Sequence, residues 1–130
     1  MVTRERFERV LTALDHIDSA VNAEYLTPDF VFEMPGLALY GPEAYYQICA
    51  EWAGAFPDLA HKLVSLISEG DRYSAEIQIS GTHLGPFNGL EPSGRSFSFL
   101  TATLGEFAGD RMATRRVFFD PAELSRQLAP

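Results

Sequence analysis

The segment from Arg111 to Asp120 contains the residues best suited to chemistry in this 130-residue sequence. Read with the two-residue period of a β-strand, it places Arg116, Phe118 and Asp120 on one side. A cation, an aromatic ring and a carboxylate on one wall of a cavity could move a proton to or from a bound molecule. The sequence therefore predicts Asp120 as the acid/base group, with Arg116 and Phe118 contacting the substrate.

Asp120 also has an interpretation as a helix cap. The run Asp120-Pro-Ala-Glu123 has an acid at the N-cap, proline at the first helical position and glutamate three residues after the cap. A carboxylate tied to backbone N–H groups stays ionised and is a weak base, whereas one in an apolar pocket is a useful acid or base. Both interpretations stay open, because a cap and a pocket group are not exclusive.

Arg116 has two interpretations as well. It could hold the developing oxyanion or the carbonyl group of a substrate. It could equally form a structural pair with Asp120, which would spoil that carboxylate as a base.

Composition limits the classes of partner. Ten Phe, five Tyr and one Trp are many aromatic residues for this length, and they could line a cavity as well as fill a core. The net charge of −8 argues against nucleic acid and against anionic membranes, because both need a basic surface. Three scattered histidines and one cysteine make no zinc pattern, and no metal site is expected. A small apolar molecule is therefore the expected partner.

The length predicts a single domain over residues 1–130. Cys49 stands alone, so an internal disulfide framework is excluded. The charged opening residues do not look like a secretory signal, and no apolar run approaches the length of a membrane span. Together these features predict a cytoplasmic protein.

Helical periodicity dominates the first half of the chain and strand periodicity the second. The patterns predict helices over residues 3–17, 18–25 and 41–56, strands over 30–34, 62–67, 73–80, 96–104 and 111–119, and a closing helix over 123–128. Residues 81–94 form a long loop rich in Gly and Pro, a kind that is often functional. Early helices and a late antiparallel sheet predict an α+β fold, in which a strongly curved sheet wraps the helices as a half-open cone.

Several aromatic residues could line a pocket inside such a cone. They come from different predicted elements and comprise Tyr25, Phe32, Trp52, Phe56, Phe97, Phe99 and Phe118. A role as plain core stays open for each of them. Cys49 belongs to the apolar stripe of its helix and is interpreted as packing, and His16 as a solvated residue at a helix end.

Six segments in this order carry a resemblance to a known family. They are Phe30-Val-Phe-Glu-Met-Pro-Gly36, Tyr40-Gly-Pro-Glu-Ala44, Ala55-Phe-Pro-Asp58, Glu69-Gly-Asp-Arg72, Gly81-Thr-His-Leu-Gly-Pro-Phe87, and Arg116-Val-Phe-Phe-Asp120 with Gln127-Leu128. The sequence resembles the SnoaL-like polyketide cyclases of the nuclear transport factor 2-like superfamily over nearly its whole length. The resemblance implies a cone-shaped α+β fold and a homodimer packed through the sheet.

The resemblance also implies a reaction. In the cyclases an Asp is the general acid/base of an intramolecular aldol ring closure without metal or cofactor, and Asp120 stands where the motif has that Asp. His83 matches a family position near the pocket mouth and could supply a second proton site, although a purely structural loop histidine is equally compatible. The sequence departs from the family at Thr114-Arg115, where many relatives carry Glu-His. It also has Met34 where related ketosteroid isomerases carry a general-base Asp.

The sequence thus predicts an enzyme of cyclase or isomerase type that acts on a polyketide-like or other apolar carbonyl compound. The alternative is a non-catalytic module of the same fold that binds a hydrophobic ligand or dimerises. In the alternative, the Asp120 carboxylate would fold onto the amides of Ala122 and Glu123 instead of facing a cavity.

Overall fold

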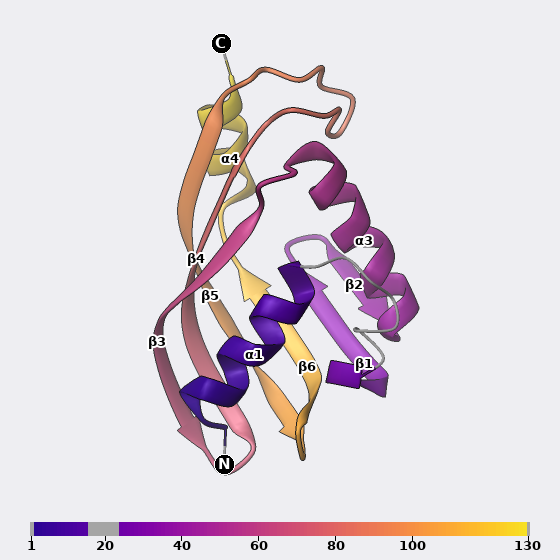
Figure 1. The fold of residues 1–130 in the computed structure, drawn as a ribbon, viewed down its shortest axis with the longest axis vertical. Helices are drawn as coiled ribbons and strands as arrows, with labels where there is room; N and C mark the ends of the chain where they lie inside the picture. The colour runs from indigo at the N-terminus through magenta and orange to yellow at the C-terminus, as the bar shows by residue number, and fades with distance from the viewer. Residues whose placement is uncertain (1, 16–23, 130) are drawn as a thin grey trace.

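A curved six-stranded sheet frames the computed structural model, which describes residues 2–15 and 24–129 (Figure 1). The elements follow in the order α1 (Arg4–Asp15), β1 (Leu26–Met34), β2 (Leu37–Tyr40), α3 (Pro42–Ala55), β3 (Ala60–Glu69), β4 (Arg72–Thr82), β5 (Ser96–Ala108), β6 (Arg111–Phe118) and α4 (Pro121–Leu128). The strand order is β2-β1-β6-β5-β4-β3. Neighbouring strands are antiparallel except β1 and β6, which are parallel, so the sheet is mixed.

Helices α1 and α3 lie on the concave side of this sheet, and the core fills the space between them (Figure 1). Helix α1 buries Phe7, Val10, Leu11 and Leu14, which recur at helical spacing. The predicted α+β fold is confirmed, and the sheet stays open because β2 and β3 are free edges.

The predicted elements form with shifted bounds. Strands β3, β4 and β5 extend further than the patterns indicate, and α3 closely matches its predicted range. Strand β2 was not predicted; it forms because a turn at Pro35 and Gly36, where Gly36 has φ 78°, folds residues 37–40 back onto β1. The end of the first predicted helix, including His16, and most of the predicted helix 18–25 lie outside the described residues.

A β-bulge in β6 decides which side chains face the interior. Thr114 pairs with Glu106 and Met112 pairs with Phe107, so Ala113 is an extra residue without a partner on β5. Met112 is buried before the bulge, whereas Arg115 is buried after it. The prediction that side chains alternate without interruption along this strand is therefore wrong. The extra residue exchanges the side chains that face the interior with those that face outward.

Two contacts and one glycine hold this bulge. The Tyr73 hydroxyl donates to the carbonyl oxygen of Thr114 at 2.9 Å, and the backbone N–H of Glu106 donates to Thr114 Oγ1 at 2.9 Å. Gly105, opposite Arg115, has no room for a side chain, since a Cβ would lie 2.1 Å from the Thr114 carbonyl oxygen and 2.6 Å from Tyr73 Oη. The register of the strand that carries Arg115 is thus fixed from β4 and β5.

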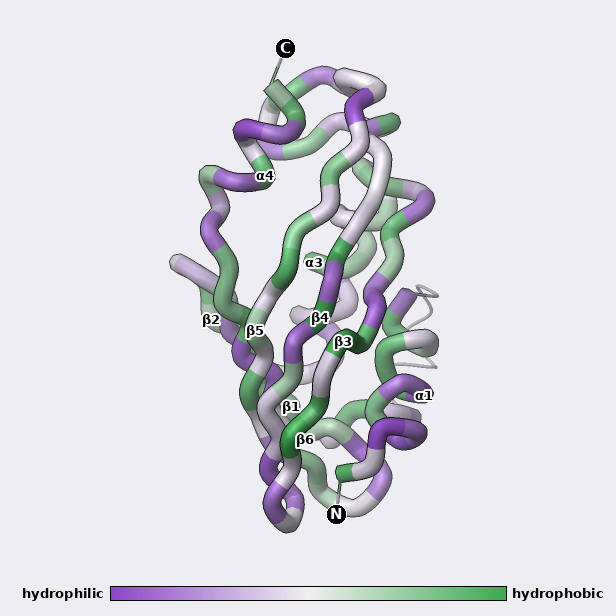
Figure 2. Tube along the Cα trace, turned by 90° about the vertical axis from the view of Figure 1, so that its left-hand side faces the viewer, coloured by the Kyte–Doolittle hydropathy of each residue, from purple (hydrophilic) through white to green (hydrophobic). Residues whose placement is uncertain are grey.

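The convex side of the sheet carries exposed apolar residues. Leu100, Leu104 and Phe118 are 49%, 39% and 46% exposed on the adjacent strands β5 and β6. Figure 2 faces this side and shows hydrophobic segments alternating with near-neutral ones along β5. No helix in the described ranges is long and apolar enough to cross a lipid bilayer.

Candidate active site

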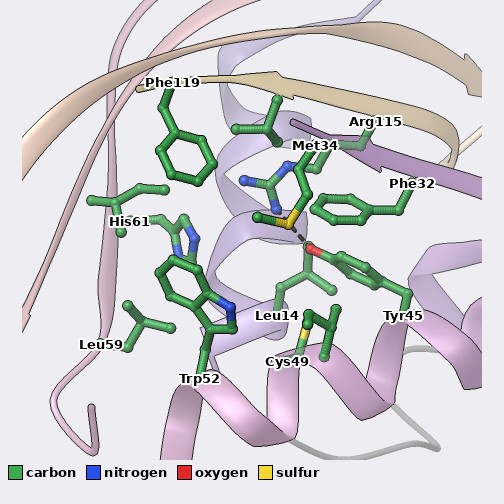
Figure 3. A pocket seen from close by; sticks show the side chains of 13 residues that line it. Leu14, Phe32, Met34, Tyr45, Cys49, Trp52, Leu59, His61, Arg115 and Phe119 are labelled. Atoms are coloured by element: carbon green, nitrogen blue, oxygen red, sulfur yellow. Dashed lines mark hydrogen bonds between the residues drawn. The ribbon is translucent and has the colours of Figure 1, made fainter. Parts of the chain in front are cut away.

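A cavity of about 70 Å³ lies between the end of α1, helix α3 and the concave face of the sheet (Figure 3). Its lining consists of Leu14, Phe32, Met34, Tyr45, Ile48, Cys49, Trp52, Leu59, His61, Ile79, Arg115, Val117 and Phe119. This volume is well below the roughly 300–1,000 Å³ of pockets for drug-sized ligands. In this conformation it can therefore hold only the reacting end of a larger molecule.

His61 and Asp15 form a hydrogen-bonded pair at the wall of the cavity. The Asp15 carboxylate lies 2.5 Å from His61 Nδ1 and accepts a second bond, of 3.3 Å, from the backbone N–H of His61. The His61 side chain is 11% exposed and that of Asp15 19%. Because a carboxylate only accepts, Nδ1 carries the hydrogen and the lone pair of a neutral ring lies on Nε2.

The surroundings keep the His61 ring neutral. Burial lowers its pKa below the ordinary value, the hydrogen bond to Asp15 opposes this, and the nearby Arg115 charge lowers the pKa further. At neutral pH the imidazole is therefore deprotonated, with Nε2 able to take up a proton.

Arg115 is a buried cation on the same cavity wall. It is 2% exposed, and its Nη1 donates to the Tyr45 hydroxyl at 2.8 Å, shown by the dashed line in Figure 3. Its Nε has no hydrogen-bond partner within the described part of the chain. Burial opposes the charge, but interactions with Tyr45, Tyr73 and Cys49 outweigh it and raise the Arg115 pKa, so the side chain stays charged.

The groups that surround Arg115 are neutral. Burial raises the pKa of the Cys49 thiol to about 11 and raises the pKa values of the Tyr45 and Tyr73 hydroxyls as well. All three therefore keep their protons at physiological pH. The described residues place no carboxylate within ion-pair distance of Arg115.

Of the aromatic residues predicted to contact substrate, Phe32 and Trp52 line the cavity. Phe56 and Phe99 lie behind its wall: the Phe56 ring is fully buried, and Phe99 stacks on Phe119 with 5.4 Å between ring centroids. Tyr25 lines a different and more polar hollow, together with Arg6, Arg9, Val10, Glu24, Asp110 and Arg111. Substrate contact by these residues stays a prediction.

Asp120, Arg116 and Phe118 lie outside the cavity. Asp120 Oδ1 accepts the backbone N–H of Ala122 at 3.0 Å, and the Asp120 side chain is 63% exposed, so the carboxylate caps α4. Arg116 pairs with Glu33 at 3.4 Å, not with Asp120, and lies over the Phe118 ring at 5.3 Å. The predicted placement on a cavity wall is wrong, because the strand turns its other side inward. An acid/base role for Asp120 stays a prediction that this geometry does not support.

His83 closes the long loop between β4 and β5. The ring is 1% exposed, and its Nδ1 accepts the backbone N–H of Ser93 at 3.2 Å. The backbone of His83 also bonds to Arg95 and Gly94. His83 is absent from the cavity lining and packs against Phe56 instead, so a second proton site there stays a prediction.

Three ionisable residues of the cavity had no predicted role in chemistry: Asp15, His61 and Arg115. Asp15 and Arg115 each carried a weak signal. Asp15 is an acid in the last turn of a helix, where the dipole disfavours negative charge. Arg115 alternates with Val117 and Phe119 and so places a lone cation on an apolar strand face. The pairing of Asp15 with His61 spans 46 residues and has no local signature.

The described residues contain no group of three His, Cys, Asp or Glu side chains placed to hold a metal ion. What the cavity offers is therefore a neutral imidazole, a guanidinium and apolar walls.

Comparison with known proteins gives a consistent result. Residues 4–128 match the family described as SnoaL-like polyketide cyclase. A candidate SnoaL-like polyketide cyclase from Jannaschia sp. CCS1 superposes with a TM-score of 0.85 at 25% identity, covering 97% of this chain and 91% of the other. TsrD from Streptomyces laurentii superposes with a TM-score of 0.82 at 26% identity, covering 99% and 98%. IdmH, a candidate polyketide cyclase from Streptomyces antibioticus, gives 0.82 at 20% identity, covering 95% and 96%, which supports the fold alone. Among curated proteins, no match reaches significance.

Proposed function

Because the chain belongs to the SnoaL-like polyketide cyclase family, we propose that it catalyses cofactor-independent acid/base chemistry on a polyketide-like or other apolar carbonyl compound. Aldol cyclisation and isomerisation are two examples of such chemistry. The observation that carries the proposal is the Asp15–His61 pair, which presents a neutral imidazole to an apolar cavity. Perturbed ionisable groups of this sort gather at functional sites.

His61 is the proton carrier in this mechanism. Nε2 takes a proton from the carbon next to the substrate carbonyl, and the electron pair of that C–H bond moves onto the carbonyl oxygen to form an enolate. The Arg115 guanidinium stabilises the oxygen as it becomes negative, and Asp15 stabilises the imidazolium. In a cyclisation the enolate carbon then attacks a second carbonyl, and His61 returns its proton to the new alkoxide. In an isomerisation the proton returns to a different carbon.

A non-catalytic binding module is the second candidate. The outward position of Asp120 favours it, because the residue expected to carry catalysis only caps α4. A module that merely binds an apolar ligand has no need of a buried guanidinium and a buried imidazole, since both oppose burial. The enzyme is therefore the better-supported reading.

Proton exchange at carbon tests the proposal without knowledge of the natural substrate. Cyclohexanone in deuterium oxide should lose its α-protons faster in the presence of the protein, as followed by NMR. The change His61→Gln should slow the catalysed exchange about 10²–10⁴-fold, the usual contribution of a general base. The change Asp120→Asn tests the other assignment, in which Asp120 and not His61 is the proton carrier. Equal exchange by wild type and His61→Gln would remove His61 from the mechanism.

We further propose that two copies of the chain associate through the convex face of the sheet. Leu100, Leu104 and Phe118 expose apolar surface on β5 and β6. Helices α1 and α3 lie on the other side of the sheet (Figure 1). Burial of such a patch against a second copy is favourable because it removes apolar area from water.

A further inference from the structure

Arg115 is a buried charge that has no counter-ion in direct contact among the described residues. Its side chain is 2% exposed, and one donor, Nη1, bonds to Tyr45. Nε has no partner within the described ranges, although an unsatisfied buried N–H group of an ion is costly. A well-packed apolar residue of similar size would avoid this cost, so the guanidinium is better explained by a ligand than by stability.

The neighbours of Arg115 cannot supply the missing negative charge. Tyr45 and Cys49 both hold their protons, because burial raises their pKa values. The Asp15 carboxylate, which contacts the lining residue His61, is already engaged by the ring and the backbone of that residue. The guanidinium is thus surrounded by neutral dipoles and retains its capacity to bind an anion.

Most of the rest of the cavity wall is apolar and favours a ligand whose body is apolar. Phe32, Trp52 and Phe119 present rings around the guanidinium, and Met34 lies in front of it (Figure 3). With a volume of about 70 Å³, the cavity has room for one small anionic group and part of the ring that carries it. A phosphate or a dianion fits poorly, because Arg115 is the only cation among the described residues that line the cavity.

We propose that the cavity is a binding site for a compact organic monoanion, a ring carboxylate or the equivalent enolate, whose oxygen binds to Arg115. That this ligand is a substrate or a reaction intermediate rests on the proposed function. The binding itself is independent of turnover. It implies that stable carboxylates of the same shape occupy the site and block it.

Trp52 provides a direct readout, since it is the only tryptophan of the chain and lines the cavity. Cyclohexanecarboxylate and its neutral isostere cyclohexanecarboxamide neither absorb nor fluoresce in the range of tryptophan. Titration with each should change Trp52 fluorescence in a saturable way. We expect the carboxylate to bind at least about tenfold more tightly than the carboxamide.

The paired variants Arg115→Met and Arg116→Met locate the site. Both remove one positive charge from neighbouring positions of β6, but Arg116 lies on the convex side with Glu33. Arg115→Met should abolish the preference for carboxylate, and Arg116→Met should leave it intact. Arg115→Lys keeps the positive charge, and it takes the place of Arg115→Met in the test if that variant does not fold.

Three results would overturn the anion site: equal affinity for carboxylate and carboxamide, no saturable signal with either, or an unchanged preference in Arg115→Met. If the protein binds carboxylate through Arg115 but does not catalyse the exchange of cyclohexanone protons, the proposed function is refuted and the anion site is supported. Exchange without any carboxylate preference would refute the anion site alone.

Discussion

The Asp15 carboxylate holds both the ring and the backbone of His61, with one oxygen 2.5 Å from Nδ1 and the other 3.3 Å from the backbone nitrogen. One side chain at the end of α1 therefore fixes the tautomer of the imidazole and the position of the strand that carries it. Orientation of a catalytic histidine through its second nitrogen is a common arrangement in enzymes.

The change Asp15→Asn should lower kcat by about 10–10²-fold with little change in KM. An asparagine can still accept the backbone bond, but it no longer stabilises the imidazolium. Steady-state kinetics or the cyclohexanone exchange rate measures the effect, and Asp29→Asn, at an exposed acid on β1, is the control. An unchanged rate in Asp15→Asn would show that the pair is only structural.

The pH dependence should follow His61. Its pKa is lowered, so kcat/KM should be level at neutral pH and fall only on acidification below the ordinary histidine range. The charged groups that face it are Asp15 from α1 and Arg115 from β6, with neutral Tyr45 and Cys49 from α3. An acid limb at or above the ordinary histidine pKa would contradict the assignment.

The same shift has a consequence for stability. Between the ordinary pKa and the lowered one, the unfolded chain binds a proton at this position and the folded chain does not. The free energy of unfolding should therefore decrease as pH falls through this window. Urea titrations of wild type and His61→Gln at several pH values measure it, and the variant should lose this part of the dependence.

Gly105→Ala should reduce the free energy of unfolding by about 1–3 kcal/mol, because the new methyl group overlaps the Thr114 carbonyl and the Tyr73 hydroxyl. It should also weaken carboxylate binding, since Gly105 pairs with Arg115. Gly54→Ala is the matched control, as nothing lies within 4 Å of the new Cβ on that helix. Equal stability of the two variants would show that the bulge tolerates adjustment.

Asp120→Ala should cost about 1 kcal/mol of stability through loss of the α4 cap, while Asp120→Asn should stay close to wild type. Neither change should slow proton exchange by more than the loss of folded protein explains. Thermal unfolding and exchange rates, measured on the same samples, separate the two effects. Loss of turnover in folded Asp120→Asn would return the acid/base role to Asp120.

Phe118→Glu should convert a dimer to a monomer, because it places a charge in the apolar patch on the convex face. Light scattering coupled to size-exclusion chromatography gives the mass directly. Leu84→Glu is the control, since Leu84 is 59% exposed on the loop and its backbone N–H bonds to Ala55 at the end of α3. A wild-type protein that is already monomeric at high concentration would refute the association.

Local sequence patterns predicted most of the architecture. The helical stripe of α1, the acid–proline start of α4 and the alternation of Tyr73, Ala75 and Ile77 are all local signals, and each element formed where it was expected. The parallel pairing of β1 with β6 joins residues about 80 positions apart and could not be inferred from period alone.

The candidate site was harder to predict than the fold. Arg115 and Arg116 are chemically identical neighbours, and only the bulge at Ala113 and the packing against α3 determine which one is buried. The role proposed for His61 depends on its contact with Asp15, and that contact depends on how α1 lies across the sheet. The helix cap at Asp120 could be predicted because capping depends on residues close in sequence. A pocket depends on residues far apart in sequence.

The unpaired residue in β6 has a consequence for how proteins of this fold could diversify. If Ala113 paired with Glu106 instead, every later residue of β6 would shift by one position along β5, which would turn Arg116 and Phe118 toward the cavity and Arg115 to the convex face without a single substitution. A shift of one residue in strand pairing can thus exchange the side chains of the cavity and those of the convex face at the same time. Comparing relatives by aligned letters alone would miss such an exchange, whereas the residue pairs between β5 and β6 would reveal it.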